Sequence, residues 1–183
     1  MSSCERGART VGRRRLLIGL AVAVLALPAC TVRPLYSSAP LATSGAPVTE
    51  ALSAVAVKPV TTREAQEVRN HLIFLLSGGK GEPAEPRYTL TLTVIGVEES
   101  AAAVQVVTEN EPTAATVTMI GYYTLSDAAG TTIAQGNRRV MSSYDVPRQE
   151  FAALRAKRDA ENRSARELAE LLQLVVAQEL SKG

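Results

Sequence analysis

The sequence predicts an α+β fold, a two-layer sandwich in which two helices cover one face of a mostly antiparallel sheet of four to five strands. Two observations predict it. Apolar residues recur with helical spacing over residues 63–76 and again over 165–176, whereas the segments between them alternate apolar and hydroxyl residues with a period of two. A helix with one apolar stripe must bury it against a sheet or another helix. The expected order of elements is β-α-β-β-β-β-α.

The first strand and helix have clear end signals. A β-prone apolar run over Leu52–Lys58 stops at a proline and is expected to be the first strand. Thr61 or Thr62 is then placed to cap a helix over residues 63–76, which Gly78-Gly79 would end. The apolar stripe of this helix consists of Ala65, Val68, Leu72, Leu75 and Leu76.

Four further β segments are expected to form an antiparallel meander. Tyr88–Val94 alternates threonine with apolar residues, which is typical of a strand buried on one face. Further strands are expected over Ala102–Thr108 and over residues 113–125. A turn at Asp127–Gly130 then leads back into Thr131–Tyr144. The core-facing residues are expected to be Tyr88, Leu90, Leu92 and Val94, followed by Val117, Met119, Gly121, Tyr123 and Leu125.

Residues 148–180 are expected to be helical. Their narrow apolar stripe consists of Ala165, Leu168, Ala169, Leu172, Val175 and Val176. Phe151 and Leu154 fall on the same stripe, but polar residues at 158, 161 and 162 interrupt it. Either the helix breaks near Lys157–Asp159, or its first turns continue past the sheet edge into solvent or a partner. A solvated turn is the preferred interpretation.

The N-terminus has the features of a lipoprotein signal peptide. Five arginines precede an apolar run over Leu16–Leu27, which is shorter than the roughly 20 residues that span a bilayer. Leu27-Pro28-Ala29-Cys30 then looks like the lipobox of bacterial lipoproteins. We therefore expect cleavage between Ala29 and Cys30 and a lipid on Cys30, with an ordinary signal peptide cut elsewhere as the alternative. A threonine rather than an aspartate follows the cysteine, which implies delivery to the outer membrane.

Three regions are therefore expected: a signal peptide over 1–29, a lipidated N-terminus and flexible tether over 30–50, and a single domain over 51–183. Residues 1–29 hold five of the 20 basic and one of the 18 acidic residues, which leaves 15 against 17, a net charge of −2. This balance gives no case for nucleic-acid binding, which needs a clustered basic face. Cys4 leaves with the signal peptide and Cys30 carries lipid, so no intramolecular disulfide is expected.

The sequence offers no catalytic or metal site, and no cofactor is expected besides the covalent lipid. His71 is the only histidine and has no second histidine or free cysteine as a partner. Gly78-Gly79-Lys80-Gly81 follows a helix and lacks the spacing of a phosphate-binding loop. Arg87, Arg138 and Arg139 are candidate contacts for anionic groups, because a guanidinium matches the geometry of phosphate.

Short motifs follow one another from Cys30 to about Leu180. They are Arg33-Pro34-Leu35-Tyr36, Arg69-Asn70-His71-Leu72, Tyr88-Thr89-Leu90, Tyr123-Thr124-Leu125-Ser126-Asp127 before Gly130, Gly136 leading to Ser143-Tyr144, and Phe151-Ala152 through Asp159-Ala160-Glu161 to Leu168-Ala169. In this order and spacing the chain resembles the LPS-assembly lipoprotein family (LptE), in its alphaproteobacterial form. No single motif is specific; the order and spacing carry the resemblance.

The resemblance implies a non-catalytic, lipid-anchored protein of the Gram-negative outer membrane. Such a protein plugs the LPS-translocating β-barrel (LptD), assists its assembly and contacts lipopolysaccharide. Arg87, Arg138 and Arg139 are candidate lipopolysaccharide contacts only from their charge and position. Two other classes remain open: an accessory lipoprotein of an envelope ABC or lipid-transport system, and an exported enzyme.

Overall fold

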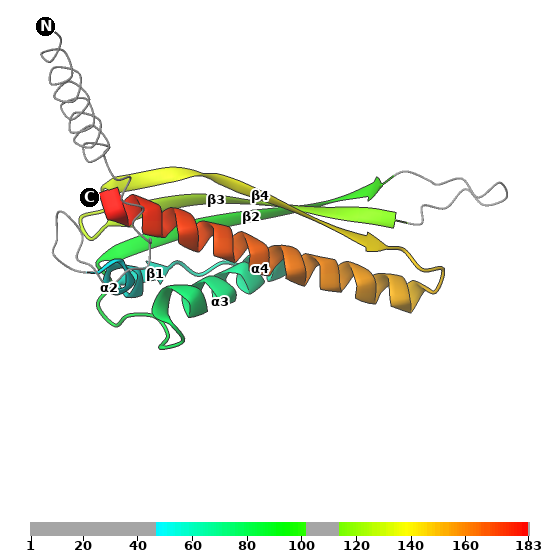
Figure 1. Ribbon diagram of the computed structural model, residues 1–183, viewed down its shortest axis with the longest axis horizontal. Coiled ribbons are helices and arrows are strands. Elements are labelled where there is room, and N and C mark those ends of the chain that lie inside the picture. Colours follow the sequence, from blue (N-terminus) through cyan, green and yellow to red (C-terminus); the bar gives the residue numbers. More distant parts are fainter. Residues whose placement is uncertain (1–46, 102–113, 183) are drawn as a thin grey trace, which may run out of the picture. The chain divides into compact units, whose positions relative to one another are not determined.

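The computed structural model describes residues 47–101 and 114–182. The chain divides into two compact units, Met1–Pro34 and Leu35–Gly183, and all described residues belong to the second. Their elements, in chain order, are α2 (Val48–Ser53), β1 (Val55–Val57), α3 (Arg63–Ser77), β2 (Tyr88–Ala101), β3 (Ala114–Asp127), β4 (Thr132–Asp145) and α4 (Glu150–Lys182) (Figure 1).

The four strands form one sheet in the order β1-β2-β3-β4. β1 is parallel to β2, whereas β2, β3 and β4 form the expected antiparallel meander. The predicted α+β class and its mostly antiparallel sheet are therefore confirmed. β2 does not stop at Val94 but stays paired with β3 until Ala101. The strand expected over Ala102–Thr108 lies outside the described residues.

The first strand is shorter than expected, because the prediction of a strand from Leu52 was wrong. Val48, Ala51 and Leu52 are spaced as neighbours on one helical face, and all three are buried as part of α2. β1 therefore begins at Val55. Burial of this helical face outweighed the β-propensity of the local run.

Helix α3 begins and ends where the sequence predicts. The Thr62 side chain accepts a hydrogen bond from the Ala65 N–H at 3.3 Å, which satisfies one free donor of the first turn. Gly78 ends the helix in the left-handed conformation, with φ of 61°. Val68 and Leu72 are fully buried, whereas Phe74 on the opposite side is 64% exposed.

Helix α4 is continuous from Glu150 to Lys182, which excludes the first of the two alternatives, a break near Lys157–Asp159. Two of the three polar residues that interrupt its apolar stripe, Glu161 and Asn162, have a partner on α3, and the third, Arg158, lies near Glu161. Arg63 donates to the Glu161 carboxylate at 3.1 Å and to the Asn162 side-chain oxygen at 2.6 Å. Because α3 satisfies these groups, the helix does not need to end there. The expected stripe from Ala165 to Val176 is buried.

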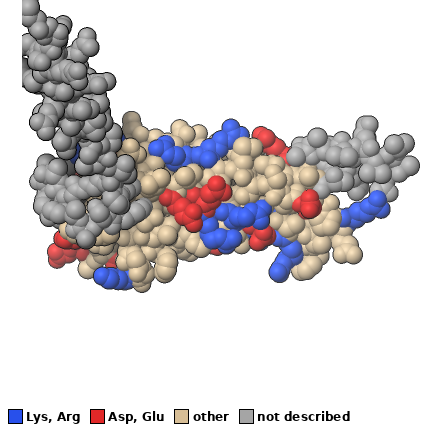
Figure 2. Space-filling view, viewed as in Figure 1, with Lys and Arg blue, Asp and Glu red and all other residues tan. Residues whose placement is uncertain are grey.

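Both long helices lie on the same face of the sheet (Figure 1). α4 approaches β3 closely at Gly121, where a Cβ atom would lie only 3.1 Å from Leu168 Cδ2. The fully buried large side chains of the core lie between these layers and include Leu72, Leu90, Met119, Leu125, Leu168 and Leu172. Acidic and basic side chains lie next to one another over the face shown in Figure 2. No described element covers the opposite face of the sheet.

Leu168 and Leu174 provide a matched test of this packing. Leu168 is fully buried, whereas Leu174 on the same helix is 47% exposed. We expect Leu168→Ala to lower the free energy of unfolding by about 2–5 kcal/mol, because it leaves a cavity beside Gly121. Leu174→Ala should change it by about 0.5 kcal/mol or less. Urea unfolding followed by circular dichroism measures both, and equal losses would contradict the assigned packing.

Candidate functional site

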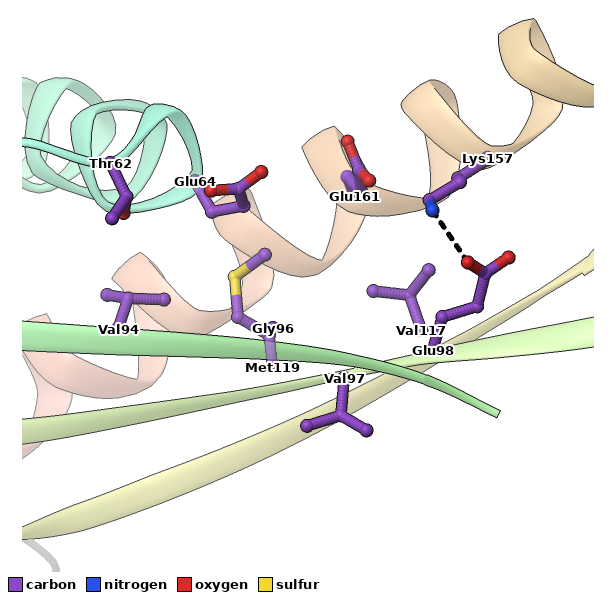
Figure 3. A pocket seen from close by; sticks show the side chains of 10 residues that line it. All are labelled: Thr62, Glu64, Val94, Gly96, Val97, Glu98, Val117, Met119, Lys157 and Glu161. Carbon is purple, nitrogen blue, oxygen red and sulfur yellow. Dashed lines mark hydrogen bonds and ion pairs between the residues drawn. The ribbon is translucent and has the colours of Figure 1, made fainter. Parts of the chain in front are cut away.

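A groove of about 380 Å³ opens beside β2, where the sheet, α3 and α4 meet (Figure 3). We call it the edge groove. Its floor is formed by Val94, Gly96, Val117 and Met119 from the helix-facing side of β2 and β3; Val97 also borders it. Its walls are Thr62 and Glu64 at the start of α3, Lys157 and Glu161 of α4, and Glu98 of β2. The floor is thus apolar and the walls are mostly charged.

The period of the strands places these residues together. Val94, Gly96 and Glu98 alternate along β2 and share its helix-facing side. Gly96 leaves the groove hollow: a Cβ atom there would meet only the Glu64 side chain, at 3.9 Å. Val117 and Met119 follow the same alternation on β3 and are buried. The groove therefore lies between the charged start of α3 and an apolar sheet surface.

One end of the groove is closed by a cluster of Glu98, Tyr144 and Lys157. The Lys157 ammonium lies 2.6 Å from Glu98 Oε2, and the Tyr144 hydroxyl donates to the other oxygen of the same carboxylate. The hydrogen bond from Lys157, followed by that from Tyr144, lowers the pKa of Glu98. The hydrogen bond to Glu98 raises the pKa of Lys157. Burial, together with the bond to Glu98, raises the pKa of Tyr144 to about 12.

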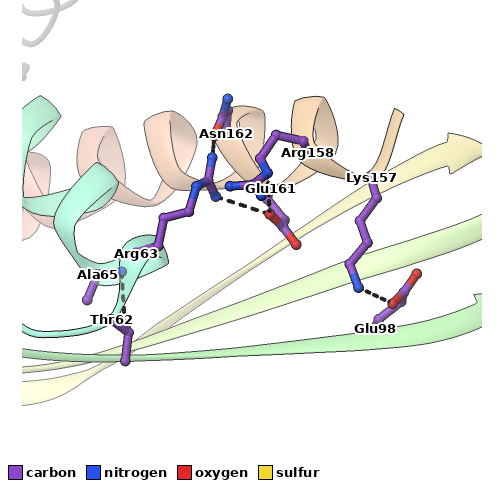
Figure 4. A network of polar contacts seen from close by, with 8 residues as sticks. All are labelled: Thr62, Arg63, Ala65, Glu98, Lys157, Arg158, Glu161 and Asn162. Carbon is purple, nitrogen blue, oxygen red and sulfur yellow. Dashed lines mark hydrogen bonds and ion pairs between the residues drawn. The ribbon is translucent and has the colours of Figure 1, made fainter. Parts of the chain in front are cut away.

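A second network joins α3 to α4 at the wall of the groove (Figure 4). Glu161 accepts from Arg63 and also lies 3.9 Å from Arg158, and its side chain is only 16% exposed. Glu64 is different, because its half-buried side chain makes no hydrogen bond or ion pair within residues 47–101 and 114–182. The groove therefore holds one carboxylate that is available to an added cation.

The three arginines predicted as anion contacts are not brought together. Arg87 precedes β2 and lies 4.0 Å from Glu50, and its guanidinium is 6.0 Å from the Tyr88 ring centre. Arg138 is on the helix-facing side of β4, 5.9 Å from the Tyr123 ring centre, whereas Arg139 is exposed on the opposite face. Arg138 is opposite Gly121 and the start of β2 is opposite Asp127, so Arg87 and Arg138 are about 20 Å apart along the strands. Ala29 and Cys30 lie outside the described residues.

Sequence reasoning missed Glu64, Glu98 and Lys157 as site residues. Lys157 and Glu98 are 59 positions apart, and no local pattern links them. Glu64 lies in the first turn of α3, where an acidic residue is favoured by the positive end of the helix whether or not a groove is nearby. The available signal was the alternation of β2, which continues beyond Val94 and places Glu98 on the core-facing side.

The described residues contain no group of three or more side chains that could hold a metal ion. His71 lies on the flank of α3, 3.7 Å from Glu67 one turn earlier. None of the helices within the described ranges is both long enough and apolar enough to cross a membrane.

Comparison with known proteins identifies the fold. No protein-family model matches the sequence, and no curated protein matches it. Among solved structures, a candidate lipoprotein from Caulobacter crescentus CB15 is 25% identical, with 74% of this chain and 97% of that chain covered and a TM-score of 0.61. Rare lipoprotein B from Shewanella oneidensis is 12% identical, with 69% and 94% covered and a TM-score of 0.51. A minor lipoprotein from Acinetobacter baumannii is 8% identical, with 69% and 91% covered and a TM-score of 0.50. The fold is therefore one that bacterial lipoproteins adopt.

The cluster of Glu98, Tyr144 and Lys157 predicts that Tyr144 ionises at a higher pH than an ordinary tyrosine. A folded-state pKa of about 12 lies above the ordinary value of about 10, so the cluster's stabilisation through Tyr144 is complete below pH 10 and is lost as the pH rises toward 12. The difference in tyrosinate absorbance between the wild type and Tyr144→Phe should therefore show a midpoint near 12. Glu98→Gln should lower this midpoint. A native-state midpoint at the ordinary value would contradict the assigned contact.

Proposed function

We propose that this chain is a non-catalytic lipoprotein, anchored by a lipid on Cys30 in the outer membrane of a Gram-negative cell, that partners and plugs the LPS-translocating β-barrel (LptD). Two findings support the general class. The Leu27–Cys30 motif fits lipid attachment, and the folded domain shares its architecture with lipoproteins of three Gram-negative bacteria. The specific partner is supported by the resemblance to the LPS-assembly lipoproteins and by one structural feature, the uncovered face of the sheet.

The uncovered face carries large apolar side chains that no described element buries. We define the open-face patch as Ile95, Val97, Tyr122 and Met141, which are 47%, 42%, 45% and 56% exposed. Val97 and Met141 lie on either side of Thr118 across three adjacent strands, so the patch extends across the sheet rather than along one strand. Contiguous apolar surface of this kind marks an interaction site in soluble domains. This patch is the observation that carries the proposal.

Hydroxyl groups surround the patch. Thr91 and Thr93 of β2 and Thr124 of β3 belong to the same face, and Thr116 is hydrogen-bonded to Ser143 across the strands at 3.0 Å. The lumen of an outer-membrane barrel is polar. A face that combines hydroxyl rows with a central apolar patch suits contact with a barrel wall, where hydroxyls can exchange hydrogen bonds and apolar side chains can exclude water.

The tether contributes to this function. A domain held at the membrane by a lipid meets a barrel in the same membrane at a high effective concentration. Moderate contact energy is then sufficient for stable partnership. Arg139 lies on the uncovered face and is the predicted lipopolysaccharide contact nearest to the proposed interface, whereas Arg87 and Arg138 remain candidates elsewhere on the domain.

Cys30→Ala tests the anchor. Without the thiol there is no attachment point for lipid, so we expect palmitate labelling to be abolished and the protein to leave the membrane fraction. Labelling with radioactive palmitate and membrane fractionation measure both. Continued labelling of Cys30→Ala would refute the assignment of the lipobox, whatever the partner of the domain.

The open-face patch predicts which variants no longer bind the barrel. Affinity purification from outer membranes should recover a large β-barrel with the wild type. Tyr122→Asp combined with Met141→Asp should reduce that recovery by roughly tenfold or more, because two charges would enter the apolar centre of the contact. The matched control is Phe74→Asp combined with Leu174→Asp, two exposed apolar positions on the helices, and it should retain the barrel.

The same purification distinguishes the alternative functions. Recovery of only periplasmic or inner-membrane partners would overturn the barrel proposal. Recovery of permease and ATPase subunits would instead identify an accessory lipoprotein of an ABC system. Depletion of the protein should also mislocalise lipopolysaccharide if the barrel proposal is correct.

A further inference from the structure

Among the described strands, most of the β2 edge of the sheet has no neighbour. β1 pairs only with Tyr88–Leu90, so within residues 47–101 and 114–182 β2 has no partner strand on that side from residue 91 onward. The Leu90 carbonyl accepts from the Lys58 N–H at 2.9 Å, which shows that the even-numbered residues of β2 direct their backbone groups outward. The outward N–H and C=O groups of Val94, Gly96 and Glu98 have no hydrogen-bond partner in the part of the chain that the structure describes.

The other edge of the sheet is protected in the ways that usually prevent strand addition. Arg138 and Arg139 lie in the middle of β4, and charged side chains on an edge strand oppose pairing with another chain. Arg163 of α4 also donates to the Ser143 carbonyl at 2.9 Å and so occupies part of that edge. The segment of β2 from Val94 to Glu98 has no proline and no bulge, and its one charged residue, Glu98, is paired with Lys157. The two edges are therefore not equivalent.

The edge groove lies directly beside this open segment and gives it chemical selectivity. Side chains of an added strand would alternate, and those on the helix-facing side would enter the groove. A long basic side chain fits such a space, because its aliphatic stem can lie on Val117 and Met119 while its charge reaches a carboxylate. Lys157 already neutralises Glu98, and Arg63 already pairs with Glu161. Glu64 is the wall carboxylate left to receive the added charge.

We propose that the β2 edge from Val94 to Glu98 binds an extended segment of a partner protein by strand addition, with an arginine or lysine of that segment in the edge groove against Glu64. The backbone groups of the edge provide affinity for any extended chain, and the groove provides the preference for a basic residue. The segment shares Ile95 and Val97 with the open-face patch, but the groove and Glu64 lie on the helix-covered side of the sheet. The site requires neither the lipid anchor nor the barrel.

The probe is a short fluorescent peptide that alternates threonine and valine and carries one central arginine. Its partner probe carries glutamate at the same position. With protein purified from membranes, fluorescence anisotropy should show the arginine peptide binding roughly tenfold or more tightly than the glutamate peptide, since a charge-assisted contact replaces a repulsive one. Amide hydrogen exchange at Val94, Gly96 and Glu98 should slow when the arginine peptide is bound.

Three variants locate the contact. Glu64→Lys should reverse the preference between the two peptides, and Glu64→Gln should abolish it. Glu67→Lys is the matched control, because Glu67 lies on the same helix beside His71 and does not line the groove, so it should leave the preference unchanged. Gly96→Pro removes an outward N–H without removing a bond to β3, and should weaken both peptides equally.

Absence of peptide binding would overturn the proposal, as would slowed exchange on β4 instead of β2. Equal binding of the two peptides to the wild type would also overturn it. Circular dichroism confirms that each variant is folded, and the Glu64→Gln result decides the matter if Gly96→Pro does not fold. The Tyr122→Asp and Met141→Asp variants retain Glu64 and the β2 edge. A failure of the strand-addition proposal can therefore be distinguished from a failure of the barrel proposal.

Discussion

The close packing of α4 against the sheet at Gly121 sets the arrangement of the domain. The missing side chain lets Leu168 approach β3, and the stripe that follows covers the middle of the sheet. α3 then packs beside α4, where Gln173 donates to the Leu75 carbonyl at 3.0 Å. Both helices therefore pack on one face of the sheet, and no described element covers the other face. Near its N-terminal end, α4 contacts its neighbours through ion pairs of Lys157 and Glu161 rather than through apolar side chains, and the edge groove lies beside this polar part.

The fold class followed from patterns that depend on one buried face. Strand alternation identified the core residues of β2 and β3, and capping chemistry at Thr62 and Gly78 identified the ends of α3. The errors occurred where tertiary contacts decide the local structure. α2 is too short to show a period, and its reason to form is the burial of Val48 and Leu52. The continuity of α4 depends on Arg63, a residue about a hundred positions away in the chain from Glu161 and Asn162.

The candidate sites were less predictable than the fold. Arg138 and Arg139 were both predicted as anion contacts from their charge and position. Adjacent residues of a strand face opposite sides of the sheet, so the predicted strand alternation already implied that these two side chains lie on different faces. The edge groove could not be predicted, because it depends on the register of β2 with β3 and on where α4 crosses the sheet. The open β2 edge depends in turn on the length of β1, which ends after Val57. Such features are properties of the assembled layers and not of any single segment.

The position of α4 after all the strands in the chain has a consequence for folding. Its stripe supplies a large share of the core, including Leu168, Leu172, Val176 and Leu180. Until these residues are synthesised, Leu90, Met119 and Leu125 have no layer to cover them, and the meander remains an exposed sheet. The domain therefore completes its fold only when α4 becomes available. Because the strands are synthesised before α4, their apolar face depends on protection from aggregation until the helix packs onto it.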